Sequence, residues 1–181
     1  MRITFDESSN KLYVADYGNH RVLGIQLSTS TTFFVAGGIG AGYSSAHLYW
    51  PVDVYLDSST NSLYICNYGA HTIVRWVIGA TGWTLVAGSP NVYSGSSMAL
   101  YNPYSVTFDS AGNMYVADLN NVRIQFFRPG SAIGKTIAGA TGMTGSTSSL
   151  FYNPRAVAVD SQFNLYVTDT SNNRIQMFRK C

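Results

Sequence analysis

This sequence of 181 residues is poor in charged side chains, which make up 11% of it, with three lysines and one glutamate. Soluble domains average about 25% charged residues. Because Lys and Glu are among the usual residues of exposed helices, the scarcity of both disfavours a helical protein. The formal net charge of +2 is too small to indicate strong nucleic-acid binding or a trap for acidic ligands.

Long apolar runs are also missing, since no stretch approaches the ~18–20 residues that a membrane helix requires. The first residues, from Met1 to Asp6, lack the apolar core of a signal peptide. Two cysteines, Cys66 and Cys181, define neither a disulfide framework nor a metal motif. We therefore expect no metal and no cofactor, and the compartment, extracellular or cytoplasmic, stays open.

What the sequence does contain is a repeat of 51 residues. Tyrosines recur at this step at positions 13, 64, 115 and 166. The pairs at 36–37, 87–88 and 138–139 are all Ala-Gly and keep the same step. Prolines at 51, 103 and 154 follow with a slip of one residue. Self-similarity at a fixed period indicates a repeat architecture, in which each repeat is one structural unit.

Each repeat contains four short apolar runs bounded by Gly, Asn, Asp and Ser, which is the pattern of short β-strands. Several runs are apolar on both faces, so both faces of each sheet must be covered, as in stacked propeller blades. We predict an all-β propeller of four-stranded blades, with strands near 3–6, 12–16, 21–26 and 32–36 that recur every 51 residues. A single domain would hold blades at 1–49, 50–101, 102–152 and 153–181.

The last repeat stops before its outer strand, so the arithmetic predicts about fifteen strands rather than sixteen. Either the chain is part of a larger propeller, or it forms a small four-bladed ring or an open arc. Unpaired strand edges and uncovered apolar faces promote association. Self-association is therefore a predicted property of an open arc.

The fourth repeat has the strongest motif. Its Pro154 is followed by an apolar run ending in Asp160, then by Leu-Tyr-Val-Thr-Asp at 165–169, Asn-Asn-Arg-Ile-Gln at 172–176 and Phe178. This pattern resembles the NHL-repeat family of β-propellers. The third repeat fits about as well, the first fits from residue 3 onward, and the second diverges most.

The resemblance implies a non-catalytic scaffold for protein interaction or ligand binding. Some similar propellers are the substrate-recognition parts of RING-type ubiquitin ligases. The alternatives that the resemblance implies are a single-stranded RNA-binding propeller and, second, a fragment of a propeller lyase or hydrolase. This chain has no RING cysteine pattern, so we expect no ligase activity in it, and we expect it not to be an enzyme.

Two sets of aspartates recur with the repeat. One set is followed by arginine five residues later, as Asp16 with Arg21, Asp118 with Arg123 and Asp169 with Arg174. The second repeat changes both partners together, to Asn67 and Thr72, which indicates a structural ion pair across a turn. The other set closes the first strand of each repeat, at 6, 57, 109 and 160, and is expected to cap turns.

Binding residues are sought where repeats differ while facing the same way. The residues just after each proline and the turns between the second and third strands reach one end of a propeller, around its axis. Aromatic, Asn and His side chains there form an adaptable contact surface. The candidates are Tyr17, His20, Asp53, Tyr68, His71, Tyr104, Asn121, Arg155 and Asn172. A protein is the expected partner, RNA is less well supported, and no membrane is expected.

Overall fold

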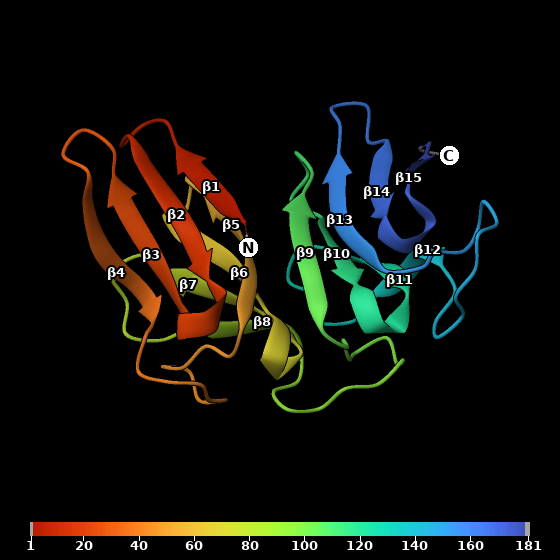
Figure 1. Cartoon of the computed structure of the whole chain (residues 1–181), viewed down its shortest axis with the longest axis horizontal. Helices are drawn as coiled ribbons and strands as arrows, with labels where there is room; N and C mark the ends of the chain where they lie inside the picture. The colour runs from red at the N-terminus through yellow and green to blue at the C-terminus, as the bar shows by residue number, and fades with distance from the viewer. Residues whose placement is uncertain (1, 180–181) are drawn as a thin grey trace.

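The computed structural model describes residues 2–179 and is all-β in that range, with four antiparallel sheets (Figure 1). The first sheet contains β1 (Ile3–Asp6), β2 (Lys11–Asp16), β3 (Arg21–Gln26) and β4 (Thr31–Gly37). The second contains β5 (Pro51–Asp57), β6 (Ser62–Asn67), β7 (Thr72–Val77) and β8 (Thr84–Gly88). The third contains β9 (Pro103–Phe108), β10 (Met114–Asp118), β11 (Arg123–Phe127) and β12 (Lys135–Gly139). The fourth contains β13 (Pro154–Val159), β14 (Leu165–Asp169) and β15 (Arg174–Phe178).

The predicted fold class is confirmed, and each sheet is one blade. In the first blade the strands begin and end within one residue of the prediction. The only helical segments between residues 2 and 179 are four three-residue 3-10 turns between the second and third strands. They are η1 (Tyr17–Asn19), η2 (Tyr68–Ala70), η3 (Leu119–Asn121) and η4 (Thr170–Asn172). In Figure 1 these turns lie at the lower end of the blades, which we call the helical-turn end.

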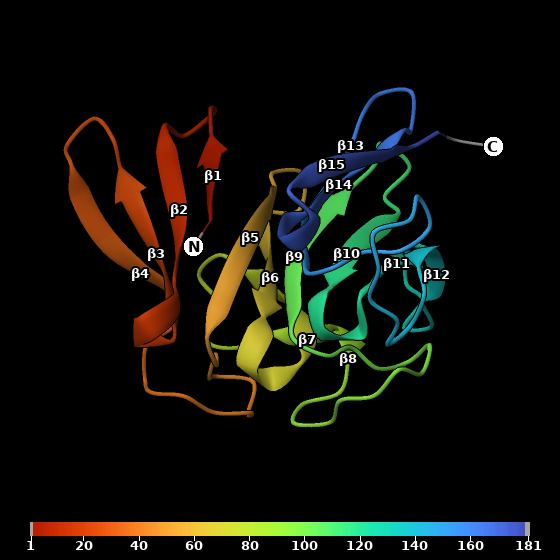
Figure 2. The same cartoon turned by 45° about the vertical axis from the view of Figure 1, so that its right-hand side comes forward.

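Apolar side chains between consecutive blades form the core. Three clusters of buried residues each join one blade to the next. One repeat position shows the pattern, since Val22, Ile73 and Ile124 are all fully buried by the following blade. Figure 2 shows the blades side by side, with the inner strands β5 and β9 adjacent. Both faces of the middle blades are therefore covered, as the doubly apolar strands predict.

The two terminal blades keep one face uncovered within residues 2–179. Ile175 occupies the position of Val22, Ile73 and Ile124 but is 69% exposed. On the first blade, Ile3 is 60% exposed, whereas its repeat equivalent Val54 is buried. No buried cluster in the described part of the chain joins the first blade to the fourth. The described residues therefore form an open arc, as Figures 1 and 2 show.

The repeated Ala-Gly pairs have a geometric cause at the end of each outer strand. Gly88 has a φ of +82°, and a Cβ there would lie 2.3 Å from the carbonyl oxygen of His71. Gly37 and Gly139 are in the same position with φ of +68° and +79°. A residue with a side chain would be strained by both the backbone angle and the contact. This explains why the glycine keeps its place in every outer strand.

Candidate functional site

The Asp–Arg pairs predicted from the five-residue spacing are present. Arg123 Nε lies 2.8 Å from Asp118 Oδ2, and the pair is buried. Arg123 also donates to the carbonyl oxygens of Gly95, Ser96 and Ala99 in the loop that enters the third blade. Asp118 Oδ1 accepts the N–H of Tyr101 from the end of that loop. The pair therefore holds the crossover between blades against the turn, which is a structural role.

The first and fourth blades contain the same Asp–Arg pair, with different contacts to the rest of the chain. Arg174 pairs with Asp169 at 2.8 Å and donates to the carbonyls of Ser146, Thr147 and Leu150 in the equivalent loop. Arg21 pairs with Asp16 at 2.6 Å but is partly exposed. The aspartate is buried in the two blades whose crossover accepts hydrogen bonds from the arginine, and it is partly exposed in the first blade.

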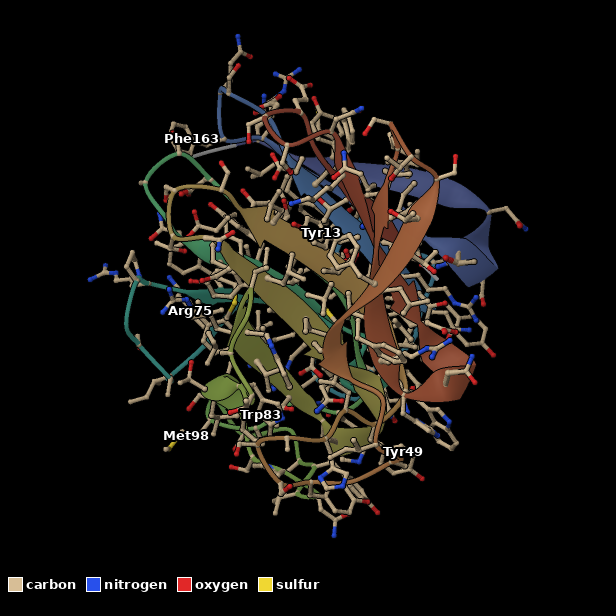
Figure 3. The ribbon with its side chains drawn as sticks, turned by 90° about the vertical axis from the view of Figure 1, so that its left-hand side faces the viewer. Tyr13, Tyr49, Arg75, Trp83, Met98 and Phe163 are labelled. Atoms are coloured by element: carbon tan, nitrogen blue, oxygen red, sulfur yellow. The ribbon has the colours of Figure 1, made fainter. Side chains whose placement is uncertain are left out.

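The second blade replaces the ion pair and keeps part of its function. Asn67 Oδ1 accepts the N–H of Tyr49 at 2.7 Å, as Asp118 does for Tyr101. Trp83 Nε1 donates to the carbonyl of His47, which is the repeat equivalent of Ala99. Figure 3 shows Tyr49 and Trp83 in the lower part of the molecule. The loop stays anchored while Asn67 Nδ2 and Thr72 Oγ1, both buried, have no hydrogen-bond partner among the described residues.

The strand-end aspartates cap turns, as predicted. Asp109 accepts hydrogen bonds from the N–H groups of Ala111 and Asn113, from Asn113 Nδ2 and from the hydroxyl of Tyr115. Burial disfavours the charged form, but these hydrogen bonds outweigh it and lower the pKa of Asp109. Asp160 accepts the same set from Gln162, Asn164 and Tyr166. These carboxylates are therefore bound by their own turns.

The turn aspartates give a pH prediction. A carboxyl with a lowered folded-state pKa contributes stability that is present above its unfolded pKa of about 3.9 and is lost as the pH falls through the folded value. We expect Asp109→Asn to be less stable than the wild-type chain near neutral pH. Its melting temperature should fall less than that of the wild type between about pH 5 and pH 3. Thermal melts followed by circular dichroism measure this. The control is Glu7→Gln, which removes a charge but none of these hydrogen bonds. Parallel wild-type and Asp109→Asn profiles would contradict the prediction.

Three of the predicted binding residues meet in a hollow at the helical-turn end. Tyr17, Tyr68 and Tyr104, from three different blades, line a hollow of 420 Å³ together with Gly18 and Val52. We call this hollow the aromatic cup. The ring of Tyr17 lies 6.4 Å from that of Tyr68, and Tyr68 lies 6.0 Å from Tyr104 in an edge-on arrangement. A row of aromatic rings from separate blades gives an amphipathic surface.

The row continues at both ends of the cup. Arg155, from the fourth blade, lies 5.3 Å above the ring of Tyr104. At the other end, Trp50 stacks on Tyr17 with ring centroids 5.7 Å apart. Burial, with smaller effects from Tyr17 and Tyr104, raises the pKa of the Tyr68 phenol. The Tyr68 hydroxyl therefore remains a hydrogen-bond donor at neutral pH.

Asp53 lies away from the cup, on the inner strand β5. It is 3% exposed and is paired with Arg2 at 3.4 Å, while its oxygens accept the N–H groups of Val54 and Val106. Arg2 also donates to Ser105, so one cation joins three inner strands around the axis. Burial raises the pKa of Asp53, and Arg2 opposes that shift. Asp53 thus stabilises the axis of the arc rather than the predicted contact surface.

The remaining candidates also make scaffold contacts. His20 Nδ1 accepts the N–H of Trp50, and His71 Nδ1 accepts the N–H of Asn102. Burial lowers the pKa of His71, which agrees with a neutral ring that accepts a hydrogen bond. Asn121 and Asn172 each donate to the aspartate of their own turn and to a crossover carbonyl, of Ser94 and Gly145 respectively. These four residues position the loops around the cup.

Sequence reasoning missed Trp50 as a surface residue. It stands directly before Pro51, and the equivalent residues before the prolines at 103 and 154 are Asn102 and Asn153. Trp50 has a positive φ of 50°, as do Asn102 and Asn153, at 52° and 62°. A tryptophan among asparagines at a left-handed position was the available signal, because Asn tolerates that conformation and Trp does not favour it.

The other chemistry-bearing residues form no further cluster in the described range. Cys66 is buried, and burial raises the pKa of its thiol well above the usual value. Residues 2–179 contain no group of three or more His, Cys, Asp or Glu side chains that could hold a metal ion. The same range holds no helix with the length and hydrophobicity needed to cross a membrane. Cys181 lies outside the described residues.

Comparisons with known proteins bear on the whole arc. A family profile described as NHL repeat matches residues 2–25 and 151–178, which lie mostly in the first and fourth blades. No curated protein matches the sequence. Among solved structures, an auxiliary nutrient binding protein from Bacteroides thetaiotaomicron is 18% identical with a TM-score of 0.75. That alignment covers 97% of this chain and 46% of the other.

Two further structures extend the range of functions seen with this fold. The nidogen–laminin complex contains a chain that is 18% identical, with a TM-score of 0.71 and coverage of 98% of this chain and 58% of the other. Streptogramin B lyase is 14% identical, with a TM-score of 0.62 and coverage of 98% and 53%. The chain thus spans about half the length of the structures it matches. At these identities the similarity shows the fold alone.

Proposed function

Because this chain belongs to the NHL-repeat family, we propose that it is a non-catalytic binding scaffold that presents its aromatic cup to a partner. The observation on which this depends is the meeting of Tyr17, Tyr68 and Tyr104 from three blades, with Arg155 added by a fourth. Side chains that face one hollow from separate repeats are held by the blades and require little ordering on binding. Preorganisation of this kind lowers the cost of association.

A protein surface fits the cup best. Tyrosine and arginine are the residues most enriched in the buried centres of protein interfaces, and Trp50 adds a third such type at the rim. The nutrient-binding description of one structural relative agrees with a binding role in general terms. A role in substrate recognition within a larger ubiquitin-ligase assembly is the finer version of this proposal.

Single-stranded RNA is the second candidate, because bases stack on aromatic rings and Arg155 is placed beside them. The small number of lysine and arginine residues weighs against RNA binding, since affinity for phosphates grows with the number of cationic contacts. A salt-dependent shift of a labelled oligonucleotide that disappears in Arg155→Ala would favour RNA over protein.

The cup can be tested with one substitution and one control. We expect Tyr68→Ala to abolish most partner recovery in affinity purification followed by quantitative mass spectrometry, because Tyr68 lies at the centre of the row. Truncation of a central aromatic anchor typically costs about 2 kcal/mol or more in binding, a loss of roughly thirtyfold. Tyr152→Ala removes an exposed tyrosine outside the cup and should leave recovery unchanged. Equal recovery with wild-type chain and Tyr68→Ala would reject the cup as the binding site.

The uncovered faces of the terminal blades support a further proposal of self-association. Ile3 and Ile175 are exposed on opposite ends of the arc, at positions that neighbouring blades bury elsewhere. We expect analytical ultracentrifugation of the 181-residue chain to show a mass that rises with concentration in the micromolar range. A monomer at all concentrations with one cooperative melt would contradict this proposal.

A further inference from the structure

The rings of the aromatic cup are tilted against one another, so the cup has notches between rings rather than one flat platform. The planes of Tyr17 and Tyr68 meet at 60°, and those of Tyr68 and Tyr104 meet at 88°. Two rings also have a neighbour on one face, since Trp50 stacks on Tyr17 and Arg155 lies over Tyr104. Nucleic-acid bases bind by stacking flat on free ring faces. Notches between aromatic rings instead fit the compact pyrrolidine rings of proline.

The hydroxyl groups of the cup are available to a ligand. Among the described residues, the tyrosine hydroxyls that donate hydrogen bonds are those of Tyr115 and Tyr166, and both donate to aspartates. The hydroxyls of Tyr17, Tyr68 and Tyr104 donate none within that part of the chain, although Tyr17 is exposed and the other two are half-buried. The cup therefore combines apolar ring surface with O–H donors that can bind the carbonyl groups of a ligand.

A polyproline II segment matches this combination. Such a helix makes no internal hydrogen bonds, so its carbonyl groups are open to donors on another surface. The ring centroids from Trp50 through Tyr17 and Tyr68 to Tyr104 are 5.7, 6.4 and 6.0 Å apart. At a rise of ~3.1 Å per residue, about six residues of polyproline II follow this row. Proline also loses little conformational freedom on binding, because its backbone is already restricted.

The charge at one end of the row sets a preference for an acidic ligand. Arg155 is exposed and is in no ion pair within residues 2–179. None of the described residues that line the cup is acidic. A segment that brings a carboxylate to Arg155 is favoured over one that brings an ammonium group.

We propose that the aromatic cup binds a proline-rich segment of another protein in the polyproline II conformation, with an acidic side chain at the Arg155 end. Prolines pack in the notches on either side of Tyr68, the tyrosine hydroxyls donate to backbone carbonyls, and Arg155 attracts the carboxylate. This inference rests on the proposed binding scaffold and specifies the chemistry of its partner.

Labelled peptides of six prolines with one glutamate are the probes, with the glutamate placed first in one peptide and last in the other. We expect at least one of them to bind the full 181-residue chain in fluorescence anisotropy at micromolar concentration. Lysine in place of glutamate should weaken that peptide by about tenfold. Alanine in place of every proline keeps the length and the carboxylate, but it should abolish binding. Failure of both proline peptides, or equal binding of the alanine peptide, would overturn the proposal.

Two variants of the chain test the roles of the hydroxyl and the cation separately. Tyr68→Phe keeps the ring and removes one donor, so it should weaken the glutamate peptide by about fivefold, whereas Tyr152→Phe, outside the cup, should not. Arg155→Glu should reverse the preference, so that the lysine peptide binds better than the glutamate peptide. Arg128→Glu makes the same charge change at an exposed arginine after β11 and is the matched control. Equal effects of Arg155→Glu and Arg128→Glu, or no reversal, would reject the placement of the carboxylate at Arg155.

Failure of this inference is distinguishable from failure of the proposed function. Loss of partner recovery in Tyr68→Ala, with neither proline peptide bound, would keep the cup as a binding site and reject its proline-rich ligand. Unchanged recovery in Tyr68→Ala would reject the cup itself. An oligonucleotide that binds the wild-type chain and not Arg155→Ala, again with neither peptide bound, would replace the proline-rich segment by RNA.

Discussion

Replacing Arg123 by alanine should be among the most destabilising single substitutions in this protein. It leaves the carboxylate of Asp118 buried without its cation and removes four further hydrogen bonds to the crossover loop and Thr141. Removing one partner of a buried ion pair costs about 3–5 kcal/mol. Chemical denaturation, with the free energy of unfolding extrapolated to water, measures the loss.

The repeat supplies its own controls for Arg123→Ala. Arg174→Ala should cost less, because 31% of that side chain is exposed, although its Asp169 partner is buried. Arg21→Ala should cost about 0–1 kcal/mol, since both members of its pair are partly exposed. Losses of similar size at all three positions would show that burial of the pair does not set its contribution.

The pH dependence gives an independent check on Arg123→Ala. Burial raises the pKa of Asp118, and the hydrogen bonds from Tyr101, Asn121 and Arg123 oppose that shift. Loss of the arginine raises this pKa further. A raised pKa means that stability is present at low pH and is lost as the pH increases through the folded-state value. The difference in the free energy of unfolding between Arg123→Ala and the wild-type chain should therefore become smaller as the pH is lowered toward about 4.

Ile124→Ala should have the second large effect. Ile124 is fully buried between the third and fourth blades, in a cluster with Phe151 and Val167. Truncation of a buried isoleucine to alanine costs about 2–5 kcal/mol, from lost burial and from the cavity left behind. Denaturant unfolding of Ile124→Ala and of the wild-type chain measures this loss of stability. Ile175, at the same position one repeat later, provides the comparison.

Ile175→Ala makes the same chemical change at the equivalent position of the last blade. Because Ile175 is 69% exposed, we expect a change within about 0.5 kcal/mol in dilute monomeric protein. A loss that grows with protein concentration would show that a second copy covers this face. A large loss at every concentration would contradict the open arc.

The sequence by itself determined the architecture, because residues that recur at a fixed spacing specify the same local structure in each repeat. Tyrosines at 51-residue intervals, doubly apolar strands and the five-residue step from Asp118 to Arg123 each specify local geometry. The strands, turns and ion pairs they predict depend on residues close together in the chain. Alternation and turn chemistry decide such features with little help from distant parts of the molecule.

Only the tertiary structure decided which of these residues are available to a partner. Tyr68 and Asp53 were equal candidates in the sequence, yet one lines an open cup and the other is buried beside Arg2. Likewise, Ile124 and Ile175 occupy one repeat position, and one is buried while the other is exposed. Exposure depends on whether a neighbouring blade covers a face and on which side chain from another strand reaches a polar group. Those neighbours are 50 or more residues away, so the local pattern that fixes a strand contains no information about them.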